Sequence, residues 1–124
     1  MSRPKQPGLT ENELVVMKEL WSHAPLTVGE ILERMNRRPK PAYTSLLTLV
    51  QAMEKKGYIS HEKQGKAFAY SPKLQQQNFT KGEIRRVSER LFGSGPLSLV
   101  MNLIQTEQLS KDEVEQLRKL LEEK

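Results

Sequence analysis

The sequence predicts a mainly α-helical protein with one small β-hairpin, and three observations support this prediction. Apolar residues recur at intervals of three and four along most of the 124-residue chain, which is the spacing of amphipathic helices. Thr10, Thr27 and Ser110 each precede a Glu by three positions, as in the capping box that opens a helix. At one place, helical spacing gives way to two short runs around a glycine, which is typical of a hairpin.

Composition narrows the class of protein. The chain has no cysteine, which excludes disulfides, thiolate metal sites and a cysteine nucleophile. Its N-terminus lacks the apolar segment of a signal peptide, and no apolar run approaches the ~20 residues of a membrane span. We therefore expect a soluble cytoplasmic protein with no stable membrane association, in which residues 1–8 form a disordered tail.

The net charge of +5 is unevenly distributed. Residues 1–74 contain twelve Lys and Arg against seven Asp and Glu, whereas residues 75–124 contain eight of each kind. A basic part joined to a neutral part predicts a polyanion-binding module attached to an element with another task. The alternative is that these charges only keep the protein in solution.

Two capping boxes, Thr10 with Glu13 and Thr27 with Glu30, predict the first two helices. We expect the first to run to about Ser22. Prolines at positions 39 and 41 should end the second, because a residue before proline disfavours helical backbone. The expected apolar faces comprise Leu14, Met17, Leu20 and Trp21 in the first helix and Val28, Ile31, Leu32 and Met35 in the second.

A third helix is expected from about Pro41 to Gly57, with Lys55 and Lys56 complementing the helix dipole at its C-terminal end. Its apolar stripe is expected to comprise Ala42, Leu46, Leu49, Val50 and Met53. After Gly57 the spacing of apolar residues is no longer helical. The runs "YISHE" and "AFAYS" predict two strands joined by the turn "KQGK", which gives a hairpin with a basic tip.

The remaining chain is predicted to be helical. The next helix begins somewhere between Leu74 and Thr80, and "GSGP" ends it. The segment "PLSLVMNLI" then forms a helix that is apolar on nearly every face, and Ser110 with Glu113 opens the last helix. The apolar faces of the first and last of these helices comprise Phe79, Ile84, Val87, Leu91, Val114, Leu117, Leu120 and Leu121.

Three helices followed by a hairpin, within about 65 residues, are the pattern of a winged helix-turn-helix, whose third helix enters the major groove of DNA. Short hydroxyl side chains on that helix bring its backbone close to base edges, and basic residues meet phosphates. An ordinary solvated helix face is the alternative. The residues expected to contact DNA are Arg37, Arg38, Lys40, Tyr43, Thr44, Ser45, Thr48, Gln51, Lys63 and Lys66.

The all-round apolar helix favours dimerisation, because one neighbouring helix cannot cover it in so small a chain. A buried central helix within a single subunit is the alternative. We therefore expect residues 9–74 to form the DNA-binding domain and residues 75–124 a helical dimerisation domain. The residues expected at the dimer interface are Leu91, Leu97, Val100, Met101, Ile104, Leu117 and Leu121.

Four segments together resemble the penicillinase-repressor family of bacterial transcription regulators, of the BlaI, MecI and CopY type. These segments are "LTENELVVMKELW", "AYTSLLTLVQAMEKKGYI", "KAFAYSP" and "SLVMNLIQTEQLSKDEVEQLRKLLEE", and the resemblance extends from Leu9 to Glu123. It implies a homodimeric repressor on a palindromic operator. It also implies that "MNLI" coincides with the bond that a membrane sensor protease cuts in response to a β-lactam, here Asn102–Leu103.

The chain departs from the family at two points. It lacks the cysteines of the copper-responsive members, so the resemblance does not extend to copper sensing. It also has an apolar Leu47 where some relatives have a basic residue on the recognition helix, so its operator should differ from theirs.

An enzyme is not expected. The only histidines, His23 and His61, do not belong to a metal-ligand pattern, and neither a catalytic carboxylate pair nor a glycine-rich phosphate loop stands out. We therefore expect no catalytic residue, metal or cofactor. Two other functions fit the same pattern: a winged-helix adapter that binds protein or RNA, and a repressor that a small ligand releases.

Overall fold

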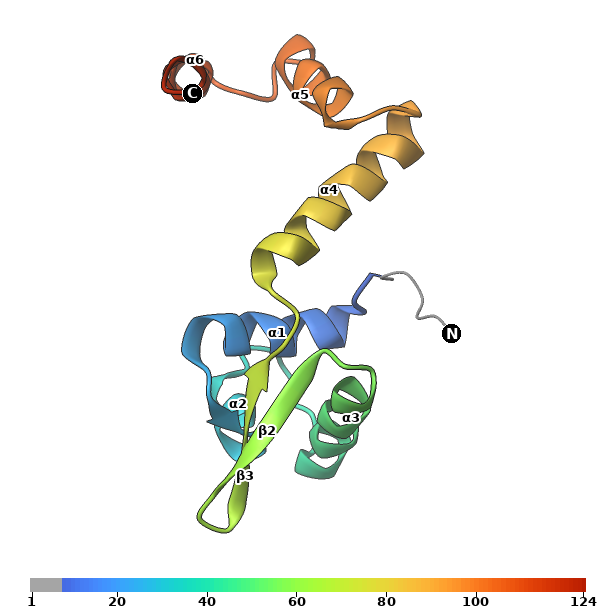
Figure 1. Ribbon diagram of the computed structural model, residues 1–124, viewed down its shortest axis with the longest axis vertical. Coiled ribbons are helices and arrows are strands. Elements are labelled where there is room, and N and C mark those ends of the chain that lie inside the picture. Colours follow the sequence, from blue (N-terminus) through green and yellow to red (C-terminus); the bar gives the residue numbers. More distant parts are fainter. Residues whose placement is uncertain (1–7) are drawn as a thin grey trace. The chain divides into compact units, whose positions relative to one another are not determined.

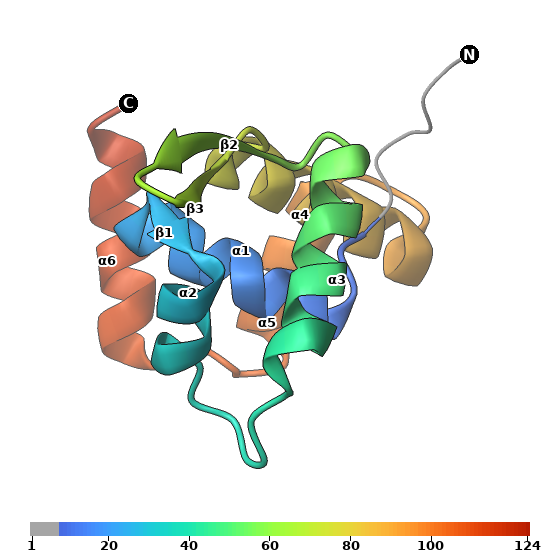
Figure 2. The ribbon, with the colours of Figure 1, turned by 90° about the horizontal axis from the view of Figure 1, so that it is seen from below.

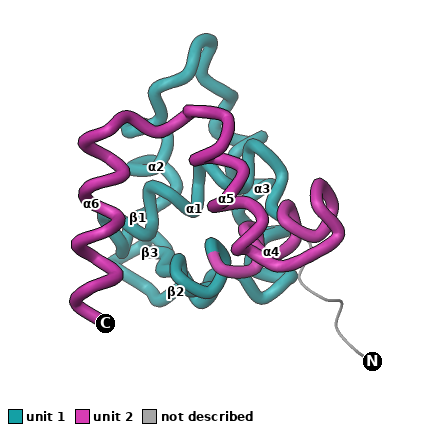
Figure 3. Tube along the Cα trace, turned by 90° about the horizontal axis from the view of Figure 1, so that it is seen from above, with its two compact units in different colours: residues 1–80 teal, residues 81–124 magenta. Residues whose placement is uncertain are grey.

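The computed structural model describes residues 8–124, so the predicted tail lies, apart from Gly8, outside the described residues. The chain divides into two compact units, residues 1–80 and residues 81–124 (Figure 3). The expected domain boundary at residue 74 stays a prediction. In order along the chain, the elements are α1 (Glu11–His23), β1 (Leu26–Thr27), α2 (Val28–Arg34), α3 (Tyr43–Lys55), β2 (Ile59–Gln64), β3 (Ala67–Pro72), α4 (Gln76–Phe92), α5 (Pro96–Gln105) and α6 (Lys111–Glu122) (Figure 1).

Local sequence signals account for where several helices begin and end. The hydroxyls of Thr10, Thr27 and Ser110 accept from the backbone N–H three residues later, and each partner glutamate accepts in return, so all three predicted capping boxes are confirmed. Gly57 has a φ of 88° and ends α3, as predicted. Its N–H donates to the carbonyl of Glu54, and the next N–H donates to Met53, which satisfies two carbonyls at the helix end.

Three expectations about the helices need correction or completion. The helix α2 ends at Arg34, before the prolines are reached, because Met35 already has extended backbone. In the predicted stripe of α3, Ala42 is exposed and caps the helix, and Leu49 is only partly buried. The fourth helix, whose start the sequence left between Leu74 and Thr80, begins at Gln76.

The sheet has three antiparallel strands in the order β1-β3-β2. The predicted hairpin is present, with His61 opposite Tyr70 and Lys63 opposite Phe68. The additional strand β1 pairs Leu26 with Tyr70 across the other edge of β3. By pairing with β3, this third strand connects the segment between α1 and α2 to the hairpin.

The hydrophobic core of the first unit lies between α1, α2, α3 and the sheet. Figure 2 shows the ribbons of these elements from below. Fully burying one such Leu, Ile or Met side chain contributes about 1.5–3 kcal/mol. The buried cluster comprises Val16, Met17, Leu20, Leu26, Val28, Ile31, Met35, Leu46, Val50, Met53, Ile59 and Tyr70. All three helices thus hold the hairpin through apolar contacts, which fixes the exposed side of α3.

The start of α4 is attached to the first unit through Trp21. The indole Nε1 of Trp21 donates to the carbonyl of Leu74 at 2.8 Å, and its ring centroid lies 5.8 Å from that of Phe79. The aromatic contact and the hydrogen bond together secure the chain where it leaves β3.

The second unit contains α5 and α6 and has few buried side chains. No residue of α5 or α6 is buried. None of the helices within residues 8–124 combines the length and the apolar character that crossing a bilayer requires.

Candidate nucleic-acid interface

The side of α3 opposite the core is polar and exposed. Thr44, Ser45, Thr48 and Gln51 are all exposed, and Tyr43 keeps 50% of its surface accessible. This arrangement follows from the helical period, because Leu46, Val50 and Met53 occupy the buried side. The helix therefore presents hydroxyl and amide groups, which both donate and accept hydrogen bonds.

One of these hydroxyls has a fixed orientation. Thr48 Oγ1 donates to the carbonyl oxygen of Thr44 at 3.0 Å. Its single hydrogen is therefore engaged within the helix, while its lone pairs can accept a hydrogen bond from outside. A donor such as the exocyclic amino group of adenine or cytosine suits this position.

The basic residues before α3 occupy the loop that joins it to α2. Arg38 is exposed at the turn of this loop. Arg37 Nη1 donates to Asn12 Oδ1 at 2.6 Å, and Lys40 Nζ donates to the carbonyl of Glu33 at 3.2 Å. These two hydrogen bonds connect the loop to α1 and α2, so the side chains of Arg37 and Lys40 each have a partner within the protein.

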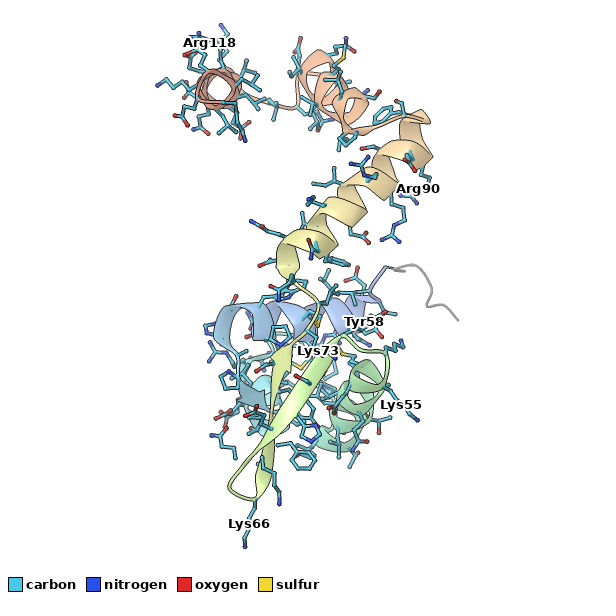
Figure 4. The ribbon with its side chains drawn as sticks, in the orientation of Figure 1. Lys55, Tyr58, Lys66, Lys73, Arg90 and Arg118 are labelled. Atoms are coloured by element: carbon cyan, nitrogen blue, oxygen red, sulfur yellow. The ribbon has the colours of Figure 1, made fainter. Side chains whose placement is uncertain are left out.

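The hairpin carries its two lysines at the tip. Lys63 and Lys66 are exposed on either side of Gly65, whose φ of 66° suits a tight turn. Figure 4 shows Lys66 extending away from the rest of the hairpin. Two exposed ammonium groups at a strand turn can meet successive phosphates of a nucleic acid.

A groove of about 300 Å³ lies between α3 and the hairpin. It brings together Tyr43 and Gln51, which the sequence singled out for DNA contact, with Lys66 from the hairpin tip. It also includes Leu47, which the sequence singled out on the recognition helix, whereas sequence reasoning did not identify the remaining lining residues as part of a DNA site. The groove is lined by Thr27, Val28, Tyr43, Leu47, Gln51, Lys66, Ala67, Phe68 and Tyr70.

A second unpredicted feature joins the hairpin to α3. His61 Nδ1 lies 2.7 Å from Glu54 Oε2 and 2.9 Å from Oε1, and a carboxylate can only accept, so Nδ1 carries the hydrogen. The His61 ring stacks on Phe68 with 4.1 Å between centroids. Burial, followed by the charge of Glu54, raises the pKa of the neighbouring Tyr70, which keeps its phenol neutral.

The residues expected at a dimer interface are largely uncovered. Leu97 leaves 68% of its surface accessible, and Leu117 alone of the seven is partly buried. The exposed members are Leu91, Leu97, Val100, Met101, Ile104 and Leu121. Asn102 is exposed and Leu103 partly buried, both inside α5. Within residues 8–124, no group of three His, Cys, Asp or Glu residues could hold a metal ion.

The three helices, the hairpin and the exposed face of α3 define a winged helix-turn-helix protein. Comparison with known proteins narrows this class. The chain belongs to the penicillinase repressor family, whose profile it matches over residues 9–123. Because this is a family of DNA-binding regulators, the expectation that the chain is not an enzyme is confirmed, as is the predicted resemblance.

Relatives match over nearly the full length. The chain is 30% identical to the penicillinase repressor of Bacillus licheniformis over 123 residues, which covers 96% of this chain and 93% of that one. It is 27% identical over 116 residues to the methicillin resistance regulatory protein MecI of Staphylococcus aureus strain N315, covering 94% of each.

Two solved structures share the winged-helix part. The DNA-binding domain of the repressor BlaI superposes with a TM-score of 0.52 at 26% identity, over 61% of this chain and 93% of that one. The monomeric form of Bacillus licheniformis BlaI, solved in complex with the blaP half-operator, gives a TM-score of 0.50 at 27% identity. The match covers 60% of this chain and 90% of that one. These likenesses confirm the predicted winged-helix fold.

Proposed function

We propose that this protein is a sequence-specific DNA-binding transcriptional repressor that acts in the cytoplasm. One observation carries the proposal: the exposed polar face of α3 adjoins a lysine-tipped hairpin, in a fold that a relative uses on an operator half-site. The first unit is thereby suited to the major groove, with the hairpin on the flanking backbone.

The contacting groups divide into two kinds. Thr44, Ser45, Thr48 and Gln51 carry short polar groups that can read base edges. The cations bind phosphates without regard to sequence, which gives affinity and positions the helix. In this scheme Arg37, Arg38, Lys40, Lys63 and Lys66 are the phosphate contacts, and Tyr43 lies between the two kinds.

The protein acts as a homodimer on a palindromic operator. The support is the exposed apolar surface of α5 and its neighbours, because a patch of this kind on a small unit needs a partner. A second copy of the same surface provides that cover, and two-fold symmetry then matches two half-sites.

Repression is relieved when the dimer is separated, by cleavage of the Asn102–Leu103 bond in response to a β-lactam or cell-wall signal. A membrane sensor protease would be the partner in that step. Exposure of Asn102 supports access, whereas the helical backbone of α5 requires local opening before a protease can bind. Release by a small ligand, without cleavage, is the alternative.

The proposal is tested by selecting sequences bound by the intact chain from a pool of random duplexes. We expect enrichment of a palindrome, together with binding that weakens steeply as salt concentration rises. A matched RNA pool separates this function from that of an RNA-binding adapter. If the chain enriches no DNA sequence, or prefers RNA or a protein, it is not a repressor of this kind.

A further inference from the structure

Apolar side chains line the groove between α3 and the hairpin, beside the polar face already assigned to base contacts. Tyr43 and Leu47 lie one helical turn apart on α3, and Phe68, 43% exposed, lines the groove from β3. Phosphates and polar base edges do not require such groups. The apolar side chains of Leu47 and Phe68, together with the ring of Tyr43, therefore point to an apolar feature of the DNA.

We propose that Tyr43 and Leu47 form the site that reads the 5-methyl group of a thymine in each half-site. This inference rests on the proposed DNA-binding function and adds one specificity determinant to it. In the major groove, the thymine methyl is the one apolar group that distinguishes a standard base pair. A helix that enters this groove can recognise it with an aliphatic and an aromatic side chain.

The groove has the charge that a DNA strand requires. Among its described lining residues, Lys66 is a cation, and none is a carboxylate. A strand whose thymine lies against Leu47 can therefore approach Lys66 with its phosphate. The next turn of α3 adds Gln51 on the same line of the helix, which suits an adjacent base rather than an apolar ligand.

The wall opposite α3 is held in place. Phe68 stacks on His61, and His61 is hydrogen-bonded to Glu54 of α3 itself. The ring stack and the hydrogen bond together constrain the distance between Phe68 and α3. A constrained apolar site discriminates a methyl group better than a mobile one, because it loses less entropy on binding.

The test uses the intact chain and the operator obtained from random duplexes. Each thymine is replaced in turn by deoxyuridine, which removes only the methyl group, and binding is measured by fluorescence anisotropy. We expect one thymine per half-site at which the wild type loses about fourfold in affinity, equivalent to ~0.8 kcal/mol for one buried carbon group. The Leu47→Ala variant should bind the thymine and uracil duplexes equally.

Two further variants complete the design. Because Leu47 also packs against the core, Tyr43→Ala, at a half-exposed position, serves as a second variant and should reduce the discrimination to less than twofold. Lys55→Gln is the matched control, because Lys55 is exposed on the same helix and is not assigned to DNA contact, and it should keep the fourfold preference for thymine. Circular dichroism verifies that each variant is folded.

The outcomes separate this inference from the function on which it rests. A wild type that selects an operator but binds every uracil duplex as tightly as thymine overturns the inference alone, as does a folded Leu47→Ala variant with full discrimination. The same holds if Tyr43→Ala alters only self-association or binding of another ligand, because the groove then has another occupant. A chain that selects no DNA sequence overturns both.

Discussion

Lys56 Nζ lies 2.7 Å from Glu13 Oε2 and thereby joins the end of α3 to the first turn of α1. Glu13 is 3% exposed and accepts from the backbone N–H of Thr10 through its other oxygen. Burial alone would raise the pKa of Glu13, but the hydrogen bonds from Lys56 and Thr10 outweigh it, so the pKa lies below its ordinary value of 4.5. The same pair raises the pKa of Lys56.

A lowered carboxyl pKa makes the free energy of unfolding depend on pH. Glu13 stabilises the fold above pH 4.5, and this contribution is lost as pH falls through its lowered pKa. We expect Glu13→Gln to reduce the free energy of unfolding by about 1 kcal/mol at pH 7, and by less at an acidic pH below the lowered pKa of Glu13. Urea unfolding at both pH values measures this. Glu19→Gln, which removes the more exposed pair with Arg34, is the control and should change stability little at either pH.

Substitutions on α3 and on the hairpin should affect DNA binding differently. Thr44→Ala or Thr48→Ala would remove a proposed base contact, so each should cost ~1–3 kcal/mol at one operator position and relax the preference there. Lys63→Ala or Lys66→Ala would remove a proposed phosphate contact, so binding to all sequences should weaken and the salt slope should fall by about one. Titrations of operator and scrambled duplexes at several salt concentrations measure both. Unchanged affinity and base preference in the threonine variants would contradict the assignment of the recognition helix.

A charged residue in the apolar surface of α5 should prevent dimerisation. Val100→Glu or Ile104→Glu would place an unpaired charge at the proposed interface, which is strongly unfavourable when buried. We expect these variants to be monomeric or unfolded at micromolar concentration, as light scattering would show. Gln105→Glu, exposed on the same helix, should remain dimeric. A monomeric wild type would disprove the proposed dimer.

Removal of the chain beyond Asn102 should separate the DNA-binding domains of the two subunits without unfolding them. Linkage of two half-sites often raises avidity ~100-fold or more, and this gain should be lost in a fragment of residues 1–102. We expect the fragment to bind one half-site weakly and the full operator with little cooperativity. Electrophoretic mobility shifts measure this, and circular dichroism serves as the folding control. Binding of the operator as tight as that of the intact chain would rule out release by this cleavage.

Replacement of Glu107 by glycine should stabilise the second unit. Glu107 has a φ of 59° just after α5, where its N–H donates to Ile104 and the following N–H donates to Leu103. A side chain in this left-handed region costs on the order of 1–3 kcal/mol, so Glu107→Gly should raise the melting temperature. Gln116→Gly, at an exposed position inside α6, is the opposite control and should lower the melting temperature. A lower melting temperature for Glu107→Gly would be the contrary result.

The sequence predicted what depends on short-range signals. The capping residues Thr10, Thr27 and Ser110, the C-terminal glycine of α3 and the hairpin all followed from spacings of a few residues. The strand β1 did not, because two residues are too short to show alternation. Its pairing with β3 depends on contacts between distant parts of the chain.

The contacts that sequence reasoning missed are also long-range. The ion pair of Glu13 and Lys56, which stabilises the fold, joins residues 43 positions apart that no local pattern connects. The same applies to Phe68, which reaches the groove beside Leu47 only because the hairpin folds back along α3. The exposed face of α3 was predictable, since helical period alone decides which residues lie opposite the buried stripe.

The hydrogen bond from His61 to Glu54 has a consequence for protein engineering. Glu54 is the one carboxylate of α3, and its counterpart is on the hairpin rather than on the helix. A chimera that grafts α3 alone onto another scaffold would therefore leave the carboxylate of Glu54 without its hydrogen-bond donor. The helix and the hairpin form a single exchangeable module, so they should be transplanted together when the specificity of a repressor is to be reprogrammed.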